Sequence, residues 1–170
     1  FSGGLSLLQV APLDLKQVEV VKGSNSTLYG GGAIAGIVNL ISKKPDGESE
    51  RSLLLNGTSA GGVDASGFFS GMSEDVGASL FTSFNTSEAY DPAGNGLSAI
   101  PEFERWTFNP QLFFEGERSE LRLGLSAVVE DRLGGGIDFI KGRRDVPAYY
   151  EDSSTERLST QLEYVTQLDS

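Results

Sequence analysis

The stretch Arg105–Phe114, RWTFNPQLFF, alternates polar and apolar side chains from one residue to the next. On an extended strand, successive side chains point to opposite faces, so residues of the same parity share a face. One face then carries aromatic and apolar side chains, namely Trp106, Phe108, Pro110, Leu112 and Phe114. The other face is polar except at Phe113. This period of two predicts a long β-strand with one apolar face and one mostly polar face.

The same alternation recurs along most of the chain. It is clear at 121–130 and 157–168, and weaker at 52–60, 65–73 and 76–86. These segments predict about six antiparallel strands, longer than the usual length of about 5 to 6 residues. The first fifty residues differ and contain two shorter strand candidates, Val18–Lys22 and Gly36–Ser42. We therefore expect an all-β chain, with a boundary near residues 45–50 where Pro45 and an Asp-Gly turn interrupt the pattern.

The predicted connections differ in length. Residues 61–64, 73–75 and 116–119 form tight turns, whereas 87–103 and 131–156 are long and rich in Gly, Pro, charge and Tyr. Because strands alternate in direction, the tight turns 73–75 and 116–119 fall on one rim and both long loops on the other. This asymmetry is typical of an outer-membrane β-barrel. A soluble β-sandwich also alternates apolar and polar residues, and it is the alternative architecture.

The composition excludes several kinds of chemistry. The 170 residues include no His and no Cys, and 13 basic against 24 acidic residues give a net charge of −11. Thiolate and imidazole metal sites, nucleophiles backed by a His base and disulfides are therefore excluded. Nucleic acid is an unsuitable partner for so acidic a chain. The sequence contains no run of about 18 apolar residues, so no transmembrane helix is predicted. Phe1-Ser2-Gly3-Gly4 offers neither an initiator Met nor a basic leader, so we expect an excerpt of a longer protein.

Two local motifs allow other interpretations. Gly31 and Gly36 have the spacing of a phosphate-binding loop, but Ile37-Val38 stands where Lys and Ser or Thr are needed, so nucleotide binding is not predicted. The carboxylate pairs are Glu74-Asp75, Glu130-Asp131 and Glu151-Asp152. Such pairs serve as general acid and base, as cation ligands, or as solvated charge. An enzyme on a β scaffold is thus an alternative to a binding or transport protein.

Four blocks near the start of the chain carry a family resemblance. They are Leu13–Ser24, Ser26–Gly30, Gly32–Gly36 and Val38–Pro45. In this order they resemble the end of the plug domain of TonB-dependent outer-membrane receptors. The resemblance implies that residues 1–47 are the C-terminal part of a plug domain. Residues 48–170 would then be the first strands of a 22-stranded plugged barrel, which six strands alone cannot close.

The resemblance also implies a function. Such receptors lie in the outer membrane of Gram-negative bacteria, bind a scarce solute and import it when TonB pulls on the plug. We therefore expect a receptor, not an enzyme, with no cofactor and no bound metal of its own. Its partners would be TonB through an upstream segment, outer-membrane lipid and a small ligand, most commonly a ferric siderophore, with haem, cobalamin and glycans as other cargoes. The alternative is a secreted or surface β-sandwich for binding or adhesion, without transport.

The resemblance assigns roles to individual residues. The plug apex would contact ligand through Phe1, Ser2, Gly3 and Leu5, and the barrel loops through Tyr90, Asp91, Asn95, Arg143, Arg144, Tyr149 and Tyr150. The two Arg and two Tyr suit an anionic aromatic ligand such as a catecholate complex, although solvated loop charge explains them too. Glu19 and Lys22 correspond to a latch between plug and barrel, with Lys where the family usually has Arg. Structural glycines are Gly23, Gly30, Gly32 and Gly36.

Overall fold

The computed structural model describes residues 12–22, 36–143 and 149–167, and the chain divides into two compact units, Phe1–Lys44 and Pro45–Ser170. In the first unit, the short 3-10 helix η1 (Pro12–Asp14) leads into strand β1 (Leu15–Lys22). Strand β1 pairs antiparallel with β2 (Gly36–Ser42). Gly36 has a φ of +125°, and a Cβ there would lie 2.5 Å from the Val21 carbonyl oxygen. Only glycine fits the start of β2.

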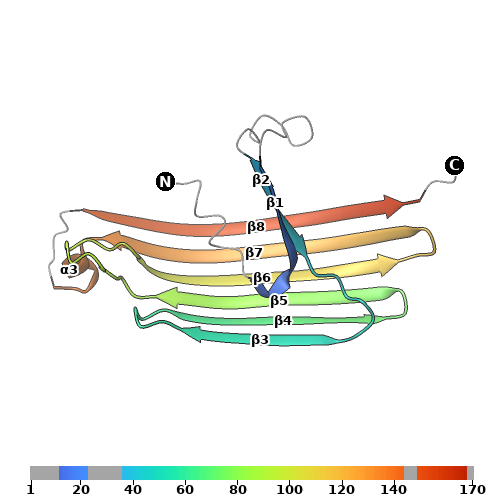
Figure 1. Ribbon diagram of the computed structural model, residues 1–170, viewed down its shortest axis with the longest axis horizontal. Helices are drawn as coiled ribbons and strands as arrows, with labels where there is room; N and C mark the ends of the chain where they lie inside the picture. Colours follow the sequence, from blue (N-terminus) through green and yellow to red (C-terminus); the bar gives the residue numbers. More distant parts are fainter. Residues whose placement is uncertain (1–11, 23–35, 144–148, 168–170) are drawn as a thin grey trace. The chain divides into compact units, whose positions relative to one another are not determined.

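The second unit is a single antiparallel sheet in the order β3-β4-β5-β6-β7-β8 (Figure 1). Its strands are β3 (Glu50–Gly57), β4 (Val63–Ser73), β5 (Val76–Ser87), β6 (Glu102–Glu115), β7 (Ser119–Gly135) and β8 (Tyr150–Thr166). The predicted all-β fold with six antiparallel strands is confirmed. In the described part of the chain, β3 and β8 each pair on one side only, so the sheet is open. No helix among the described residues has the length and hydropathy to cross a membrane.

The two ends of the sheet are built differently. At one end, Glu74-Asp75 joins β4 to β5, and residues 116–118 join β6 to β7. At the other end lie the turn 58–62, the loop 88–101 and the described residues 136–143 and 149 of the last loop (Figure 1). The last loop contains the one-turn helix α3 (Ile137–Ile140). We call these the tight-turn end and the loop end.

The last two strands are longer than the sequence predicts. Residues 131–156 were expected to form one loop, but β7 continues to Gly135 and β8 begins at Tyr150. Direct pairs such as Asp131 with Ser154 and Leu133 with Asp152 extend the hairpin. Charged residues occupy both faces here, so the apolar period is absent while the backbone ladder persists. Hydrogen bonding between strands does not require an apolar face.

The sheet has two faces of opposite character. The apolar face carries Leu53, Leu55, Phe69, Leu80, Phe84, Trp106, Phe108, Leu112, Phe114, Leu123, Leu158 and Leu162, which share a face through the strand pairing. The polar face carries Asp64, Ser66, Ser83, Asn85, Arg105, Thr107, Arg122, Glu130 and Arg132, with Phe68, Phe81 and Phe113 among them.

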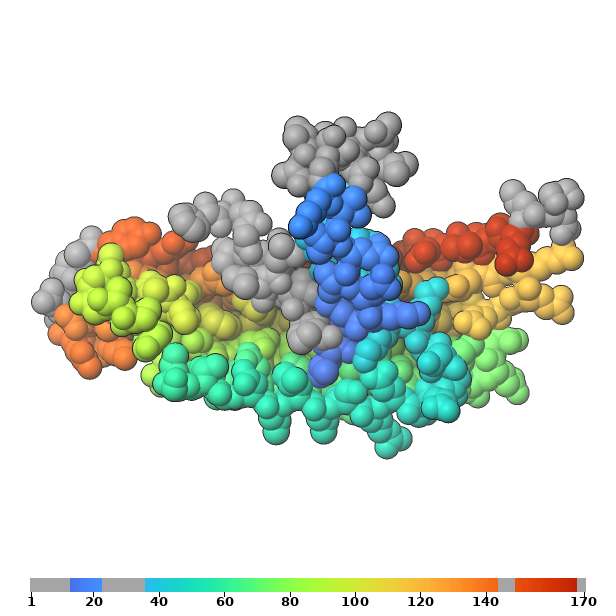
Figure 2. All heavy atoms as spheres, in the orientation of Figure 1, coloured from blue at the N-terminus to red at the C-terminus, as the bar shows by residue number. Residues whose placement is uncertain are grey.

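Burial of the two faces is the reverse of that in a soluble protein. On the apolar face, Leu55 is 84% exposed and Trp106 is 54% exposed. Side chains at the β3 edge, in blue-green, project free of the neighbouring strands in Figure 2. On the polar face, Phe81, Arg105 and Glu130 are almost fully buried. The buried side chains therefore lie mostly on the polar face, whereas the apolar face is exposed.

Candidate functional site

A buried charge cluster lies on the polar face near the loop end. Arg105 on β6 and Glu130 on β7 are direct cross-strand partners. The Arg105 guanidinium donates from Nε to Glu130 Oε2, and Arg132 Nη2 lies 2.9 Å from Glu130 Oε1. The side chains of Arg105 and Glu130 are only 7% and 5% exposed. One carboxylate thus holds two guanidinium groups, and the cluster carries a net positive charge.

An aromatic ring and an unused donor complete the cluster. The Arg105 Cζ atom lies 5.1 Å from the centre of the Phe103 ring, a cation–π distance. Phe103 is also the cross-strand partner of Arg132. The buried Nε of Arg132 has no hydrogen-bond partner within the described protein. A buried guanidinium with a spare N–H is suited to an anionic oxygen acceptor.

A hydrogen-bonded polar belt extends from this cluster across the sheet. Asn85, the cross-strand partner of Arg105, donates from Nδ2 to Asp64 Oδ1 at 2.8 Å. Asn56 donates to the other oxygen of Asp64 at 2.9 Å. Polar side chains from β3 to β7 are therefore held in fixed positions at this level of the sheet. Nearer the tight-turn end, Arg122 donates to Gln111 at 2.9 and 3.2 Å.

The two long loops are joined to each other by their backbones. Ser98 N donates to Gly135 O at 2.8 Å, and Ile137 N donates to Gly96 O at 3.0 Å. The Ser98 hydroxyl oxygen accepts a hydrogen bond from Gly135 N at 2.9 Å. Gly135 has a φ of +116°, and a Cβ there would lie 2.4 Å from the Tyr149 carbonyl oxygen. We call the joined residues 88–101, 136–143 and 149 the rim module.

Asp91 organises the first loop of the rim module. Its Oδ2 accepts a hydrogen bond from Gly96 N at 2.7 Å. This bond, with further backbone N–H groups of residues 93–95, lowers the pKa of the Asp91 carboxyl, while desolvation opposes the shift. Asn95 also forms a local hydrogen bond, because its Oδ1 accepts from Leu97 N at 3.0 Å. Both side chains therefore have local structural partners.

The aromatic residues predicted to contact ligand lie on the rim module or, for Tyr150, at the adjoining start of β8. Tyr90, Tyr149 and Tyr150 are each about half exposed, and the Tyr150 ring lies 5.5 Å from the Phe139 ring of α3. Arg143 is exposed and lies 3.7 Å from Asp138. The structure thus brings the two predicted loop groups to one end of the sheet. Phe1, Ser2, Gly3, Leu5 and Arg144 lie outside the described residues.

The predicted latch residues lie on β1. Glu19 accepts hydrogen bonds from Gln17 and Asn39, both at 3.1 Å, whereas Lys22 is exposed at the strand end. Because they are three residues apart on one strand, Glu19 and Lys22 point to opposite faces of the hairpin. The predicted structural glycines Gly23, Gly30 and Gly32 lie outside the described residues.

Two features of the site were not found from the sequence. The sequence predicts a loop at Arg132 and no role for it, although the period of two does continue from Arg122 through Glu130 to Arg132. The pair Glu130-Asp131 was considered as one unit, but neighbouring strand residues face opposite ways, so the two carboxylates diverge. Among the described residues, no group of three or more acidic side chains is arranged to hold a metal ion.

Comparison with known proteins identifies one domain. Residues 1–37 match the family model of the TonB-dependent receptor plug domain. The match ends within β2 and confirms the resemblance predicted from the sequence. Plug domains of this kind belong to receptors and transporters. No solved structure matches the chain.

We predict that Glu130→Ala lowers the free energy of unfolding by about 3 kcal/mol, because it leaves two guanidinium groups without their shared carboxylate. Urea unfolding of the complete protein in detergent measures this loss. Glu163→Ala is the matched control, since Glu163 is 47% exposed on its side chain and lies 3.7 Å from Arg122. The control should change stability by less than about 1 kcal/mol. Equal effects of the two substitutions would contradict a special role for the cluster.

We predict that the first loop of the rim module loosens only in strong acid. Since the folded-state pKa of Asp91 is lowered, its contribution to stability is complete above the unfolded pKa of about 3.9 and is lost as the pH falls through the folded value. Hydrogen-exchange protection of the Gly96 amide, corrected for the intrinsic rate, should therefore be constant from neutral pH to about pH 4. Asp91→Asn should lower this protection at pH 7, whereas Asp152→Asn should not. A midpoint above pH 5 would refute the assignment.

Proposed function

We propose that this chain, whose residues 1–37 are plug-domain sequence of a TonB-dependent receptor, supplies part of the plug and part of the transmembrane wall of an outer-membrane transporter. In this proposal the sheet β3–β8 is a section of the barrel wall, with the apolar face toward lipid and the polar face toward the lumen. The exposure of the apolar face carries the proposal.

A sheet with this surface is costly to keep in water. Burial of apolar surface is worth roughly 25 cal/mol per Å², and soluble proteins rarely expose large contiguous apolar patches. Exposed apolar side chains occur on all six strands, from Leu53 on β3 to Leu162 on β8. Lipid hydrocarbon removes this cost. A β-sandwich, the alternative architecture, would bury such a face against a second sheet.

The lengths of the strands and the hydrogen bonds of two threonine hydroxyls also support a lipid environment for the apolar face. Strands β4 to β8 contain 11, 12, 14, 17 and 17 residues, and a tilted transmembrane strand needs about 9 to 11. On the apolar face, Thr82 and Thr86 donate their hydroxyls to the carbonyl oxygens of Thr107 and Phe103, at 3.2 and 3.0 Å. A hydroxyl without a partner is costly in hydrocarbon, and these two are satisfied.

We propose a ferric siderophore as the cargo, bound beneath the rim module. The Arg105–Glu130–Arg132 cluster lies near the same end of the sheet as the loops, because Arg132 precedes Gly135 by three residues on β7. A net positive, buried cluster suits an anionic metal complex, and the exposed Tyr side chains suit an aromatic one. The protein would bind and move this complex without reacting with it. TonB would supply the energy through a segment upstream of the plug sequence.

The membrane assignment predicts a heat-modifiable barrel. The complete protein, expressed in a Gram-negative host, should fractionate with the outer membrane and migrate faster in gel electrophoresis before boiling than after it. Removal of the signal sequence provides the control that remains in the cytoplasm. A compact monomer that is soluble without detergent would refute the proposal.

The cargo assignment predicts charge-dependent binding. Arg132→Gln should weaken binding of a ferric catecholate siderophore by about tenfold, because one charge-assisted hydrogen bond is lost. Fluorescence quenching of the detergent-solubilised complete protein measures the affinity. Arg118→Gln, in the turn at the opposite end of the sheet, should bind as the wild type does. If no ferric siderophore binds the intact barrel, the cargo is wrong although the membrane assignment stands.

A further inference from the structure

A single basic residue lies on the apolar face. Among the described strand residues, Arg51 on β3 is the one cation of this face. The acidic residues of this face all lie toward the loop end, namely Glu102, Glu104, Asp131, Asp152 and Glu156. Arg51 is exposed, and its side chain forms no hydrogen bond or ion pair with another described residue. A guanidinium at a lipid-facing position is costly unless an anion or water reaches it.

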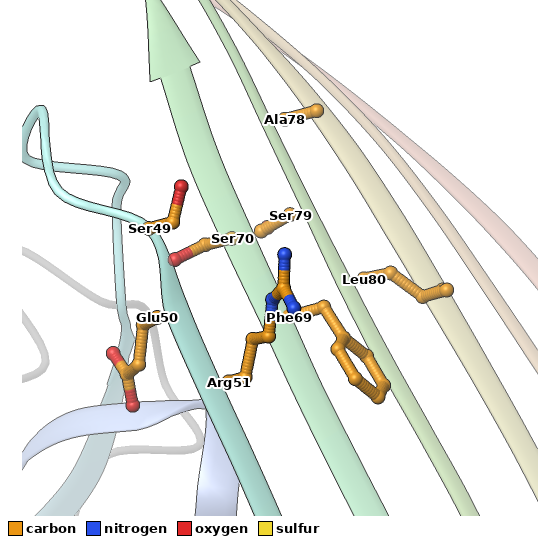
Figure 3. Close-up of a pocket in the computed structure, with 8 residues that line it drawn as sticks. All are labelled: Ser49, Glu50, Arg51, Phe69, Ser70, Ala78, Ser79 and Leu80. Atoms are coloured by element: carbon orange, nitrogen blue, oxygen red, sulfur yellow. The ribbon is translucent and has the colours of Figure 1, made fainter.

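Arg51 borders a cavity next to apolar side chains. Its cross-strand partner is Phe69, whose own partner on the next strand is Leu80. Figure 3 shows Arg51 beside Phe69, with Leu80 on the adjoining strand. The cavity measures about 520 Å³ and is also lined by Ala78 and Glu50. The Glu50 carboxylate accepts a hydrogen bond from the Ser52 hydroxyl at 3.0 Å, and Glu50 has the strand parity of the polar face. The small Ala78 and the neighbouring Gly71 leave the space that larger side chains would fill on this face.

A second cavity continues from the first toward the loop end. Phe69 lines both cavities. The second measures about 300 Å³ and is lined mostly by apolar residues, namely Leu53, Leu55, Ala65, Gly67, Phe84 and Trp106. Gly67 leaves room for the Phe69 ring, because a Cβ there would lie 2.9 Å from that ring and would displace it. The Phe84 and Trp106 rings, 4.5 Å apart, form its far wall.

We propose that these two cavities bind one anionic phospholipid of the membrane, with its phosphate at Arg51 and an acyl chain over Gly67 toward Trp106. This inference rests on the proposed membrane-spanning function. Arg51 supplies charge complementarity for the phosphate, and the uncharged second cavity supplies a surface for hydrocarbon. The distance from Arg51 to Leu55 is four residues, or about 13 Å along the strand. That length fits within one leaflet of a hydrocarbon core about 30 Å thick.

The orientation of this lipid follows from the sheet. Arg51 is the second residue of β3, which begins near the tight-turn end, and the chain would point toward the loop end. In outer-membrane barrels the short turns face the periplasm, so we place the tight-turn end on that side. The bound lipid would therefore come from the inner leaflet of the outer membrane, where glycerophospholipids carry the phosphate.

Native mass spectrometry of the complete protein tests the headgroup contact. Phosphatidylglycerol and phosphatidylcholine with identical acyl chains are added separately to the detergent-solubilised barrel, and their affinities are compared. The wild type should prefer phosphatidylglycerol by about fivefold, the effect of one basic residue at a membrane surface. Arg51→Gln should abolish this preference, and Arg51→Lys should retain part of it. Arg157→Gln, which removes the same charge from the polar face, should retain all of it.

A second variant tests the acyl-chain contact. Ala65→Leu should fill the second cavity and weaken binding of both lipids while leaving their affinity ratio unchanged. Ala127→Leu, the same change on the same face away from both cavities, should bind both lipids normally. Unchanged lipid preference in Arg51→Gln, unchanged affinity in Ala65→Leu, or a dimer that occludes Arg51 would each overturn the proposal. A heat-modifiable barrel with no such lipid preference would refute only this inference, whereas a soluble protein would refute the membrane function itself.

Discussion

The register between neighbouring strands is the constraint on which the rest of the structure depends. Direct partners across a sheet share a face, so a shift of one residue in any pairing would move a whole strand's side chains to the opposite face. Glu130 would then leave Arg105 and face the same way as Trp106. The buried charge cluster and the open apolar face are therefore two results of one register, maintained through all five pairings of the second unit.

Local periodicity predicts the strands and their faces, because the direction of a side chain depends only on its parity along the strand. It does not predict which residues meet across strands. Arg105 and Glu130 are separated by 25 residues, and only the length of the turn at 116–118 brings them together. The ends of β7 and β8 were missed for a related reason, since charged residues on both faces remove the apolar signal there.

The loop site is the least predictable part of the structure. Tyr90 and Tyr149 could be selected as exposed loop aromatics, but nothing in their local sequence indicates that their loops are bonded to each other. That contact depends on Ser98 and Gly135, two small residues without an obvious functional signature. The plug sequence is the opposite case, because several short blocks in a fixed order identified it, and residues 1–37 match the plug-domain family model.

The bonds that join the two loops involve backbone atoms and the side chain of Ser98, whereas Asp91 and Asn95 form bonds within the first loop. The exposed rings of Tyr90 and Tyr149 take no part in them. The atoms that hold the two loops together are thus different from the aromatic side-chain atoms that the loops expose. Under the proposed function, substitutions at the exposed rings would change which molecule is recognised without breaking the bonds between the loops, so related proteins would diversify their cargo at these positions while keeping the same backbone.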